Sequence, residues 1–291
     1  MGASLGLRAF RAIVVRPVTL TIIVAVLLGG VGGQLLASAG ESDQIVIGNT
    51  GGTLSSIIRV DNALIIFGGG TGRSDLADLL GRSTLPWKRQ VDLLIVPGWD
   101  TEQATGALGL LERQDVKQIV ILGQPSTETV WTVLYQTASS RAVPVNVVNR
   151  RSIIEIDPAA SLELTTGDPF SSASSEFALV TLRNHAVHLS FLDASKEGLQ
   201  ALNDAGFTPP RTHALVLTRA LSGLSTASSL RVQPAGQRAG EFDLGFSSYQ
   251  RDLRQGEHLT LGLAASQLRF DLDAVQRSGG PSLPATPSPG S

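Results

Sequence analysis

The stretch LLIVPGWDTEQATGALGLLERQDVKQIVILG, from Leu93 to Gly123, constrains the fold most strongly. It begins with an unbroken apolar run, passes through a polar loop into a helical pattern, and ends in a second apolar run. A short apolar run bounded by turn residues is typical of a strand that is buried on both faces. This strand–helix–strand unit therefore predicts a sheet covered by helices.

The same alternation continues along the chain. Short runs rich in β-branched residues predict strands at 45–49, 54–60, 63–67, 91–97, 116–123, 143–149, 152–156, 161–166, 177–183, 186–192 and 213–218, with late edge strands at 242–248 and 258–264. Helical patterns lie at 74–81, 101–113, 128–141 and 196–206. No break in composition divides residues 44–275, so we expect one α/β domain there. The Pro- and Ser-rich residues 277–291 are predicted to be disordered.

The N-terminus carries a membrane signal. Residues 17–40 contain no charged side chain, and Arg8, Arg11 and Arg16 precede them. A helix over 17–39 is long enough to span a bilayer, and the basic cluster predicts that residues 1–16 stay in the cytoplasm. A cleaved signal peptide is the alternative, because Ala37-Ser38-Ala39 fits a cleavage site. Both readings place the rest of the chain outside the cytoplasmic membrane, and the first makes it a single-pass membrane protein.

Composition excludes some chemistry. The chain has no cysteine and four histidines, so thiolate metal sites and disulfides are absent. All 25 acidic residues but only 20 of the 23 basic ones follow Arg16, a balance of −5. That balance gives no electrostatic footprint for nucleic acid, and we expect no nucleic-acid partner.

The order of the segments resembles the metallo-β-lactamase fold, and within it the soluble domain of the ComEC family of DNA-uptake competence proteins. The stretch IVIGNTGGTLSSIIRVDNALIIFGGG is similar to the first strands and glycine turn of that family. LLIVPGWDTEQATGALGLLE is similar to the strand, HxHxDH loop and helix that follow. SSEFALVTLRNHAVHLSFLDAS and HALVLTRALSGLSTASS resemble the strands that end in a TGD turn and an HHGS segment. The resemblance implies an αββα sandwich, two mixed sheets with outer helices, behind the N-terminal transmembrane helix.

The motif residues of the family are mostly replaced. A Phe, Phe67, stands where the family has its first aspartate. The HxHxDH positions fall on Gly98, Asp100, Glu102 and Gln103, and the HHGS histidines fall on Arg219 and Ala220. Only the aspartate of the TGD turn is retained, as Asp193, although Leu192 precedes it.

These replacements predict a degenerate site. Zinc prefers imidazole or thiolate ligands, and the matched positions offer none. We expect no catalytic residue, no metal ligand and no cofactor, with Phe67 excluding water and Arg219 paired to Asp193 or Asp100 in place of the cation. The expected role is binding or assembly with a protein partner at the membrane.

Several alternatives remain open. Asp100, Glu102 and Asp193 could hold a divalent cation such as calcium or magnesium, which would make the chain a metal-dependent hydrolase or phosphodiesterase linked to DNA uptake. Against that, Asp100 and Glu102 suit the start of the helix that follows. A purely structural surface module is the third possibility.

Three other features suggest chemistry more weakly. The glycine-rich 67–75 lies between a strand and a helix, where amides could cradle phosphate, or it is a tight turn. Ser222, Ser225 and Ser228 lack a His–acid pair at recognisable spacing. The histidines are interpreted as structural, and His185 and His188 are placed in one strand with their side chains on opposite faces. The others are His213 and His258.

Overall fold

The computed structural model describes residues 43–83, 90–166, 176–185, 187–204, 206–207, 210–219, 228–235, 249–264 and 267–270. All of them belong to one compact unit, residues 42–291. The predicted membrane helix at 17–39, the strand at 242–248 and the tail at 277–291 lie outside these residues. Within them, no helix combines the length and apolar character needed to cross a membrane.

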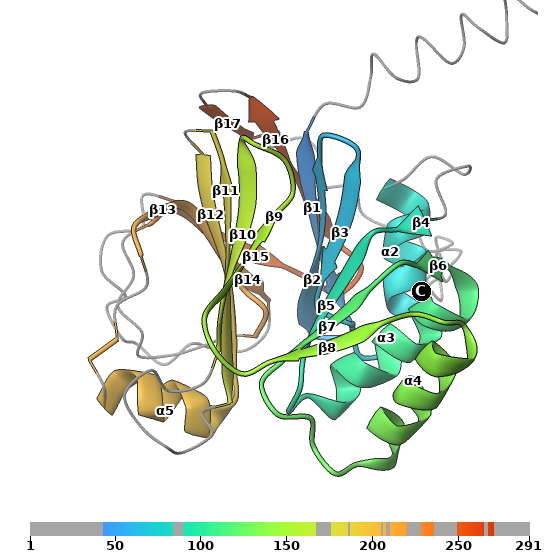
Figure 1. Ribbon diagram of the computed structural model, residues 1–291. Helices are drawn as coiled ribbons and strands as arrows, with labels where there is room; N and C mark the ends of the chain where they lie inside the picture. Colours follow the sequence, from blue (N-terminus) through green and yellow to red (C-terminus); the bar gives the residue numbers. More distant parts are fainter. Residues whose placement is uncertain are drawn as a thin grey trace, which may run out of the picture. The chain divides into compact units, whose positions relative to one another are not determined.

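Two large mixed sheets form the fold (Figure 1). The first has the order β17 (Gln267–Phe270), β16 (His258–Ala264), β1 (Gln44–Thr50), β2 (Thr53–Val60), β3 (Ala63–Phe67), β5 (Leu93–Pro97), β7 (Ile119–Leu122), β8 (Val145–Val148). The second has the order β15 (Tyr249–Leu253), β14 (Ser228–Pro234), β13 (Thr212–Leu217), β12 (Val187–Ala194), β11 (Phe177–Asn184), β10 (Ala160–Thr166), β9 (Ser152–Glu155). Each sheet has an antiparallel half and a parallel half, which confirms the predicted α/β class with two mixed sheets.

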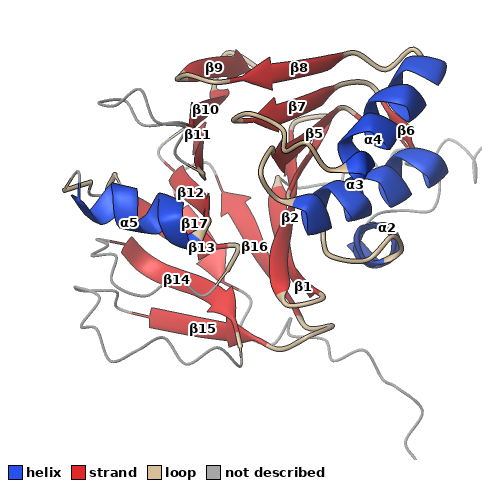
Figure 2. Cartoon of the chain, turned by 90° about the horizontal axis from the view of Figure 1, so that it is seen from below, coloured by secondary structure: helices blue, strands red, loops and turns tan. Residues whose placement is uncertain are grey.

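Helices cover the outer faces of the sheets (Figure 2). The first sheet carries α2 (Asp75–Ser83), α3 (Thr101–Arg113) and α4 (Thr129–Ser140), and the second carries α5 (Lys196–Asp204). The strands alternate between two apolar environments: Ile45 and Ile47 pack between the sheets, whereas Val46 packs under the helices. Because both of their faces are covered, β5 and β7 are apolar throughout, as the sequence indicated.

Three local predictions are wrong. The runs at 91–97 and 116–123 are each interrupted, and their first residues form a small separate sheet of β4 (Gln90–Val91) and β6 (Asp115–Val116). The break at Asp92 has a cause, since its Oδ2 accepts from Leu64 N at 2.8 Å and its own N–H donates to Leu64 O. The segment 258–264 is not at an edge, because β16 lies between β17 and β1.

The third wrong prediction concerns His185, which was placed in one strand with His188. His185 lies instead in the turn between β11 and β12, with a positive φ of 49°. Its N–H donates to Ala159 O. The two histidines are therefore in different elements: His185 lies in the turn between the strands predicted at 177–183 and 186–192, and His188 lies in the second of them.

The glycine-rich segment after β3 lets α3 approach the first sheet closely. A Cβ on Gly106 of α3 would lie 1.8 Å from Gly69 O, and a Cβ on Gly69 would lie 1.7 Å from Gln103 O. Only glycine fits at such separations. This contact fixes the N-terminal turn of α3 at the end of the sandwich where the candidate site lies.

Candidate functional site

Three chain segments meet at one end of the sandwich. The loop after β5 leads into α3, and the carboxyl ends of β12 and β13 lie side by side because these two strands are parallel. A backbone hydrogen bond from Leu54 N to Thr218 O, 2.8 Å long, joins the first sheet to the second at this point. Polar side chains that are far apart in sequence are thereby brought together.

Asp100 begins helix α3. Its Oδ1 accepts from the backbone N–H groups of Glu102 and Gln103, both at 3.1 Å, which is N-cap geometry. The side chain is almost fully buried, so its negative charge is stabilised chiefly by the helix terminus and by its other partners. The predicted capping role of Asp100 is confirmed, and its second oxygen remains available to the cluster.

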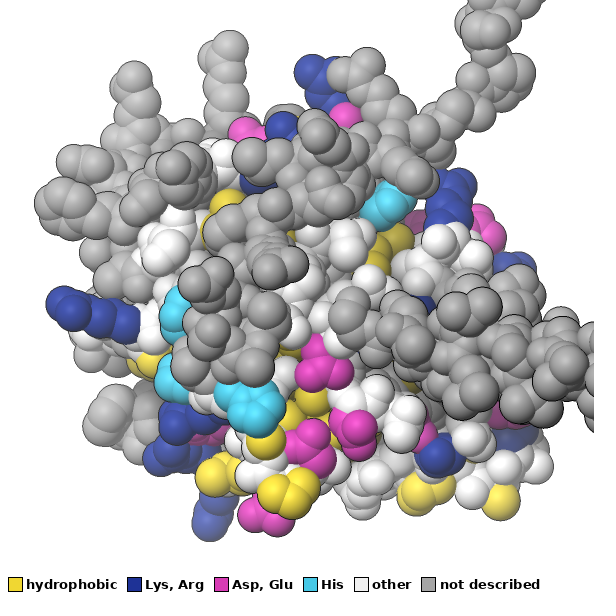
Figure 3. Space-filling view, turned by 90° about the horizontal axis from the view of Figure 1, so that it is seen from above, with side chains coloured by type: hydrophobic (Ala, Val, Ile, Leu, Met, Phe, Trp, Pro, Cys, Tyr) yellow, Lys and Arg dark blue, Asp and Glu magenta, His cyan; other side chains and the backbone are white. Residues whose placement is uncertain are grey.

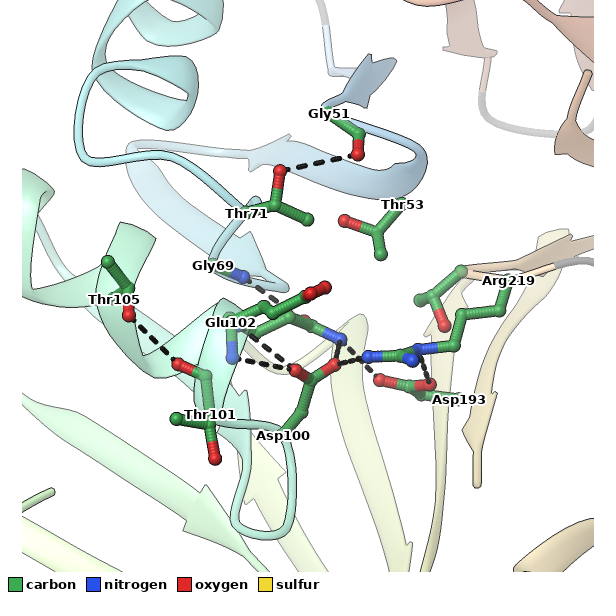
Figure 4. Close-up of polar contacts among 12 residues, drawn as sticks. Gly51, Thr53, Gly69, Thr71, Asp100, Thr101, Glu102, Thr105, Asp193 and Arg219 are labelled. Carbon is green, nitrogen blue, oxygen red and sulfur yellow. Dashed lines mark hydrogen bonds and ion pairs between the residues drawn. The ribbon is translucent and has the colours of Figure 1, made fainter. Parts of the chain in front are cut away.

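Arg219 provides the cation of this site (Figure 4). It follows β13, and its guanidinium Nη2 donates to Asp100 Oδ2. Its Nε lies 3.7 Å from Asp193 Oδ1, the distance of an ion pair and too long for a hydrogen bond. The side chain of Asp193 is fully buried and that of Asp100 is 2% exposed, whereas that of Arg219 is 35% exposed. One guanidinium therefore faces two buried carboxylates and is itself the part that meets solvent.

Gln103 ties the two carboxylates together. Its Nε2 donates to Asp100 Oδ2 at 2.7 Å and to Asp193 Oδ2 at 2.5 Å. Its Oε1 accepts from Gly69 N at 3.2 Å, which fixes the orientation of the amide. Every hydrogen-bonding group of this buried side chain is thus used inside the chain. Asp100, Gln103, Asp193 and Arg219 are called the Arg219 cluster below.

The electrostatics of the cluster are dominated by burial. Desolvation, and then the charge of Asp100, raises the pKa of Asp193 from 3.8 to about 6, although Arg219 and hydrogen bonds from Thr218 and Gln103 act in the opposite direction. For Arg219, desolvation lowers the pKa, but the charges of Asp100 and Asp193 outweigh it and the net pKa is raised. Arg219 therefore stays cationic while Asp193 takes up a proton in mildly acidic solution.

The remaining predicted positions lie around the cluster rather than in it. Phe67 is fully buried in the core between the sheets, where its ring packs 5.8 Å from that of Phe191. Gly98 is pressed against backbone, since a Cβ there would lie 2.9 Å from Gln124 O. Glu102 is exposed and acts on Arg219 through its charge alone. Ala220 lies outside the described residues.

Two of the histidines, His188 and His213, lie far from the Arg219 cluster. His188 and His213 lie near the beginnings of β12 and β13, and their rings are 6.2 Å apart. Asp193 is five residues along β12 from His188, which corresponds to roughly 16 Å of extended strand. Figure 3, which views the opposite end of the sandwich, shows histidine side chains on that surface. No imidazole therefore reaches the cluster from these two strands.

The donors around the cluster do not suit zinc. They are two carboxylates and an amide, with a guanidinium among them, whereas zinc sites use imidazole or thiolate ligands. In the described part of the chain, no group of three or more His, Asp or Glu residues is arranged to hold a metal ion. Glu102 is exposed, and it contacts Asp100 through its backbone N–H, which donates to Asp100 Oδ1, and not through its carboxylate.

The glycine-rich segment is a tight turn. Gly68 N donates to Ile95 O, Gly69 N to Gln103 Oε1, Thr71 N to Thr50 O and Gly72 N to Asp75 Oδ2. A phosphate cradle needs such amides to point at a ligand, and these four are already bonded within the chain. These hydrogen bonds favour the tight turn over the phosphate site. Of the three serines, Ser228 begins β14 and the others lie outside the described residues.

Sequence reasoning missed two contributors to the cluster. The Thr218 side chain lowers the pKa of Asp193, and Gly69 N donates to Gln103 Oε1. Thr218 was predicted only as the last residue of the strand at 213–218, and Gly69 only as part of the glycine-rich segment 67–75. Thr218 directly precedes Arg219, and its role follows only from the pairing of β12 with β13.

No protein-family model and no curated protein sequence matches this chain. Solved structures that are similar to it include zinc-bound PqqB from Methylobacterium extorquens, with a TM-score of 0.45 and 11% identity over 72% of this chain and 89% of that one. The metallo-β-lactamase fold protein YhfI from Bacillus subtilis has a TM-score of 0.45 and 9% identity over 74% and 97%. The subclass B3 metallo-β-lactamase MEM-A1, from a soil metagenome library, has a TM-score of 0.37 and 10% identity over 60% and 79%.

Proposed function

We propose that this chain is a catalytically degenerate domain of the metallo-β-lactamase fold that works by binding or assembly and not by hydrolysis. The observation that carries the proposal is the position of the Arg219 guanidinium, which pairs with both Asp100 and Asp193. A cation held by the protein itself neutralises the carboxylates that a metal-dependent enzyme would use as ligands. The ComEC-like character and the loss of the ancestral motifs are parts of this proposal.

The chemistry of the cluster supports a role without hydrolysis. Metal-assisted hydrolysis needs a water molecule whose pKa is lowered towards 7 by a strongly held cation with an open coordination position. Asp193 has no exposed surface, and both amide protons of Gln103 are taken by carboxylates. Neither side chain is therefore placed to act as a general base on a substrate that approaches from solvent.

The solvent-facing part of the cluster suits recognition. Arg219 is partly exposed, and Glu102 stands beside it at the start of α3. A guanidinium pre-oriented by two carboxylates offers its outer N–H groups at a fixed angle, which favours a planar acidic partner group. A protein partner with an acidic group at this position, at the outer face of the cytoplasmic membrane where residues 17–39 would anchor the chain, fits this surface.

The test combines metal binding with restoration of the ancestral residues. The wild-type chain and a Gln103→His/Arg219→His double variant are compared by elemental analysis and by melting temperature with and without zinc. We expect no stoichiometric zinc and little change in melting temperature for the wild type. A metal present at about 100 times its Kd stabilises the folded state by about 2.7 kcal/mol, so a working site would raise the melting temperature measurably.

The double variant is the matched control, because it exchanges the amide and the guanidinium for imidazoles at the same backbone positions. Zinc-dependent stabilisation of the variant alone supports a relic site. Stoichiometric zinc or manganese in the wild type, with phosphodiesterase activity that Asp193→Ala abolishes, would replace this proposal with the metal-dependent hydrolase.

A further inference from the structure

Among the residues that the structure describes, strand β9 forms an edge of the second sheet. It pairs with β10 on one side, with Ile153 opposite Glu163 and Glu155 opposite Ser161, and it ends the order of strands in that sheet. An open edge presents unpaired backbone groups that can add a strand from another chain. The question is whether the side chains of β9 discourage or favour such pairing.

The backbone groups that face outward can be assigned from one hydrogen bond. Ile156 N donates to Ala160 O at 3.0 Å across the β9–β10 pair. In an antiparallel pair, successive residues direct their N–H and C=O groups alternately to the two sides. Ile154 therefore faces β10, whereas Ile153 and Glu155 direct their backbone groups to the open edge, and Arg151 continues the same alternation.

The same residues expose their side chains. Ile153 is 63% exposed, one of two large hydrophobic side chains found exposed among the described residues. Arg151 and Glu155 are also exposed, whereas Ile154 packs against the core between the sheets. The edge thus shows a basic, an apolar and an acidic side chain at every second position, all on the outer face of the sheet.

We propose that two copies of this chain associate through β9, antiparallel and with Ile153 at the two-fold axis. This register sets Ile153 opposite Ile153 of the second copy, so that both residues exchange their outward N–H and C=O groups. Arg151 of each copy then lies opposite Glu155 of the other, so the dimer contains two of these charge pairs. The two seven-stranded sheets join into one continuous sheet.

Two constraints set this register: residues with outward-facing backbone groups must lie opposite one another, and opposite charges must face each other. A shift by one residue would set residues with outward-facing backbone groups opposite residues with inward-facing ones, and the backbone hydrogen bonds between the two strands would be lost. A shift by two in one direction would set Arg151 opposite Ile153, and the exposed charges would lose their partners. Opposite charges on facing positions stabilise a strand pair, and like charges destabilise it.

Arg151 is already oriented for this contact. Its Nε lies 2.6 Å from Glu163 Oε1 on β10, which holds the guanidinium along the outer face of the sheet. The remaining N–H groups of a guanidinium can donate to a second carboxylate. The neighbouring edge strand β8, by contrast, has no charged residue between Val145 and Val148, so nothing in its side chains selects a register.

Disulfide cross-linking tests the register directly, because the natural chain has no cysteine. In the full-length Ile153→Cys variant, the two cysteines would be a hydrogen-bonded pair with Cα atoms about 5.5 Å apart, within disulfide range. We expect mild oxidation of membranes carrying this variant to give a covalent dimer. The control Glu155→Cys places its cysteines four residues apart along the paired strands, about 13 Å, and should stay monomeric.

A charge exchange tests the association itself. The full-length wild-type chain in detergent should have a polypeptide mass of twice 30.5 kDa by light scattering. Glu155→Arg sets two arginines against each other and should halve that mass, while Arg151→Glu/Glu155→Arg should restore it. Far-ultraviolet circular dichroism verifies that each variant is folded. A monomeric wild type, or cross-linking of Glu155→Cys as fast as Ile153→Cys, would overturn the proposal.

Discussion

Replacing Arg219 with alanine should destabilise the domain in a pH-dependent way. The change leaves Asp100 and Asp193 buried without their cation. Removing one partner of a buried ion pair costs about 3–5 kcal/mol. Because about a third of the Arg219 side chain is exposed (35%), solvent screening reduces the expected loss in the free energy of unfolding to about 2–3 kcal/mol at pH 8.

The sign of the pH effect follows from Asp193. Its folded pKa of about 6 lies above its ordinary value of 3.8, so the folded state binds the proton more tightly. Wild-type stability therefore falls as pH rises from about 4 to 6 and levels off above that. Without Arg219, which lowers the pKa of Asp193, the decline continues to higher pH. The loss caused by Arg219→Ala should thus be smaller at pH 5, where Asp193 is largely protonated and chiefly the contact with Asp100 is lost, and largest near pH 8.

Urea unfolding of residues 42–291, followed by tryptophan fluorescence at pH 5 and pH 8, measures both values. The control is Arg219→Ala/Asp193→Asn, which also removes the buried charge at position 193. We expect this double variant to recover part of the stability at pH 8 and to lose most of the pH dependence. Equal losses at both pH values, or a loss below about 0.5 kcal/mol at pH 8, would refute the electrostatic reasoning.

Two further predictions concern packing and topology. Gly106→Ala should lower the free energy of unfolding by at least about 2 kcal/mol, because its Cβ would meet Gly69 O at 1.8 Å and the backbone must shift, and urea titration measures the loss. The control Gly81→Ala, with nothing within 4 Å of the new Cβ, should raise it by up to about 1 kcal/mol; a neutral Gly106→Ala would contradict the close approach. A reporter fused after Ser291 that is active only outside the cytoplasm should be active, and activity of a cytoplasm-only reporter would reject export.

Much of the fold could be predicted because it depends on local patterns. The apolar runs at β1, β3 and β5 are strands in the structure, and the polar residue before the helix at 101–113 caps it. Such features are set by neighbours within a few residues, since β-branched runs favour extended backbone and a carboxylate binds free N–H groups at a helix start. The α/β class followed from the alternation of these elements, and the two mixed sheets were implied by the resemblance to the metallo-β-lactamase fold.

The interruptions of these patterns were decided by tertiary contacts. Asp92 breaks the run at 91–97 because it bonds to Leu64 of the neighbouring strand, and His185 takes a positive φ in the turn between β11 and β12. Neither event changes the hydrophobic pattern around it, so periodicity alone does not reveal it.

The sequence by itself determined which residues were available to the Arg219 cluster, but not how they would be joined. It fixed the absence of cysteine, the scarcity of histidine and the presence of an arginine after one apolar strand. Gln103 lies 90 residues from Asp193, and Arg219 lies 119 residues from Asp100. Only the parallel pairing of β12 with β13, and the seating of α3 against Gly69, bring these side chains within bonding distance. Such contacts depend on the register of whole strands, which is set by the packing of both sheets together.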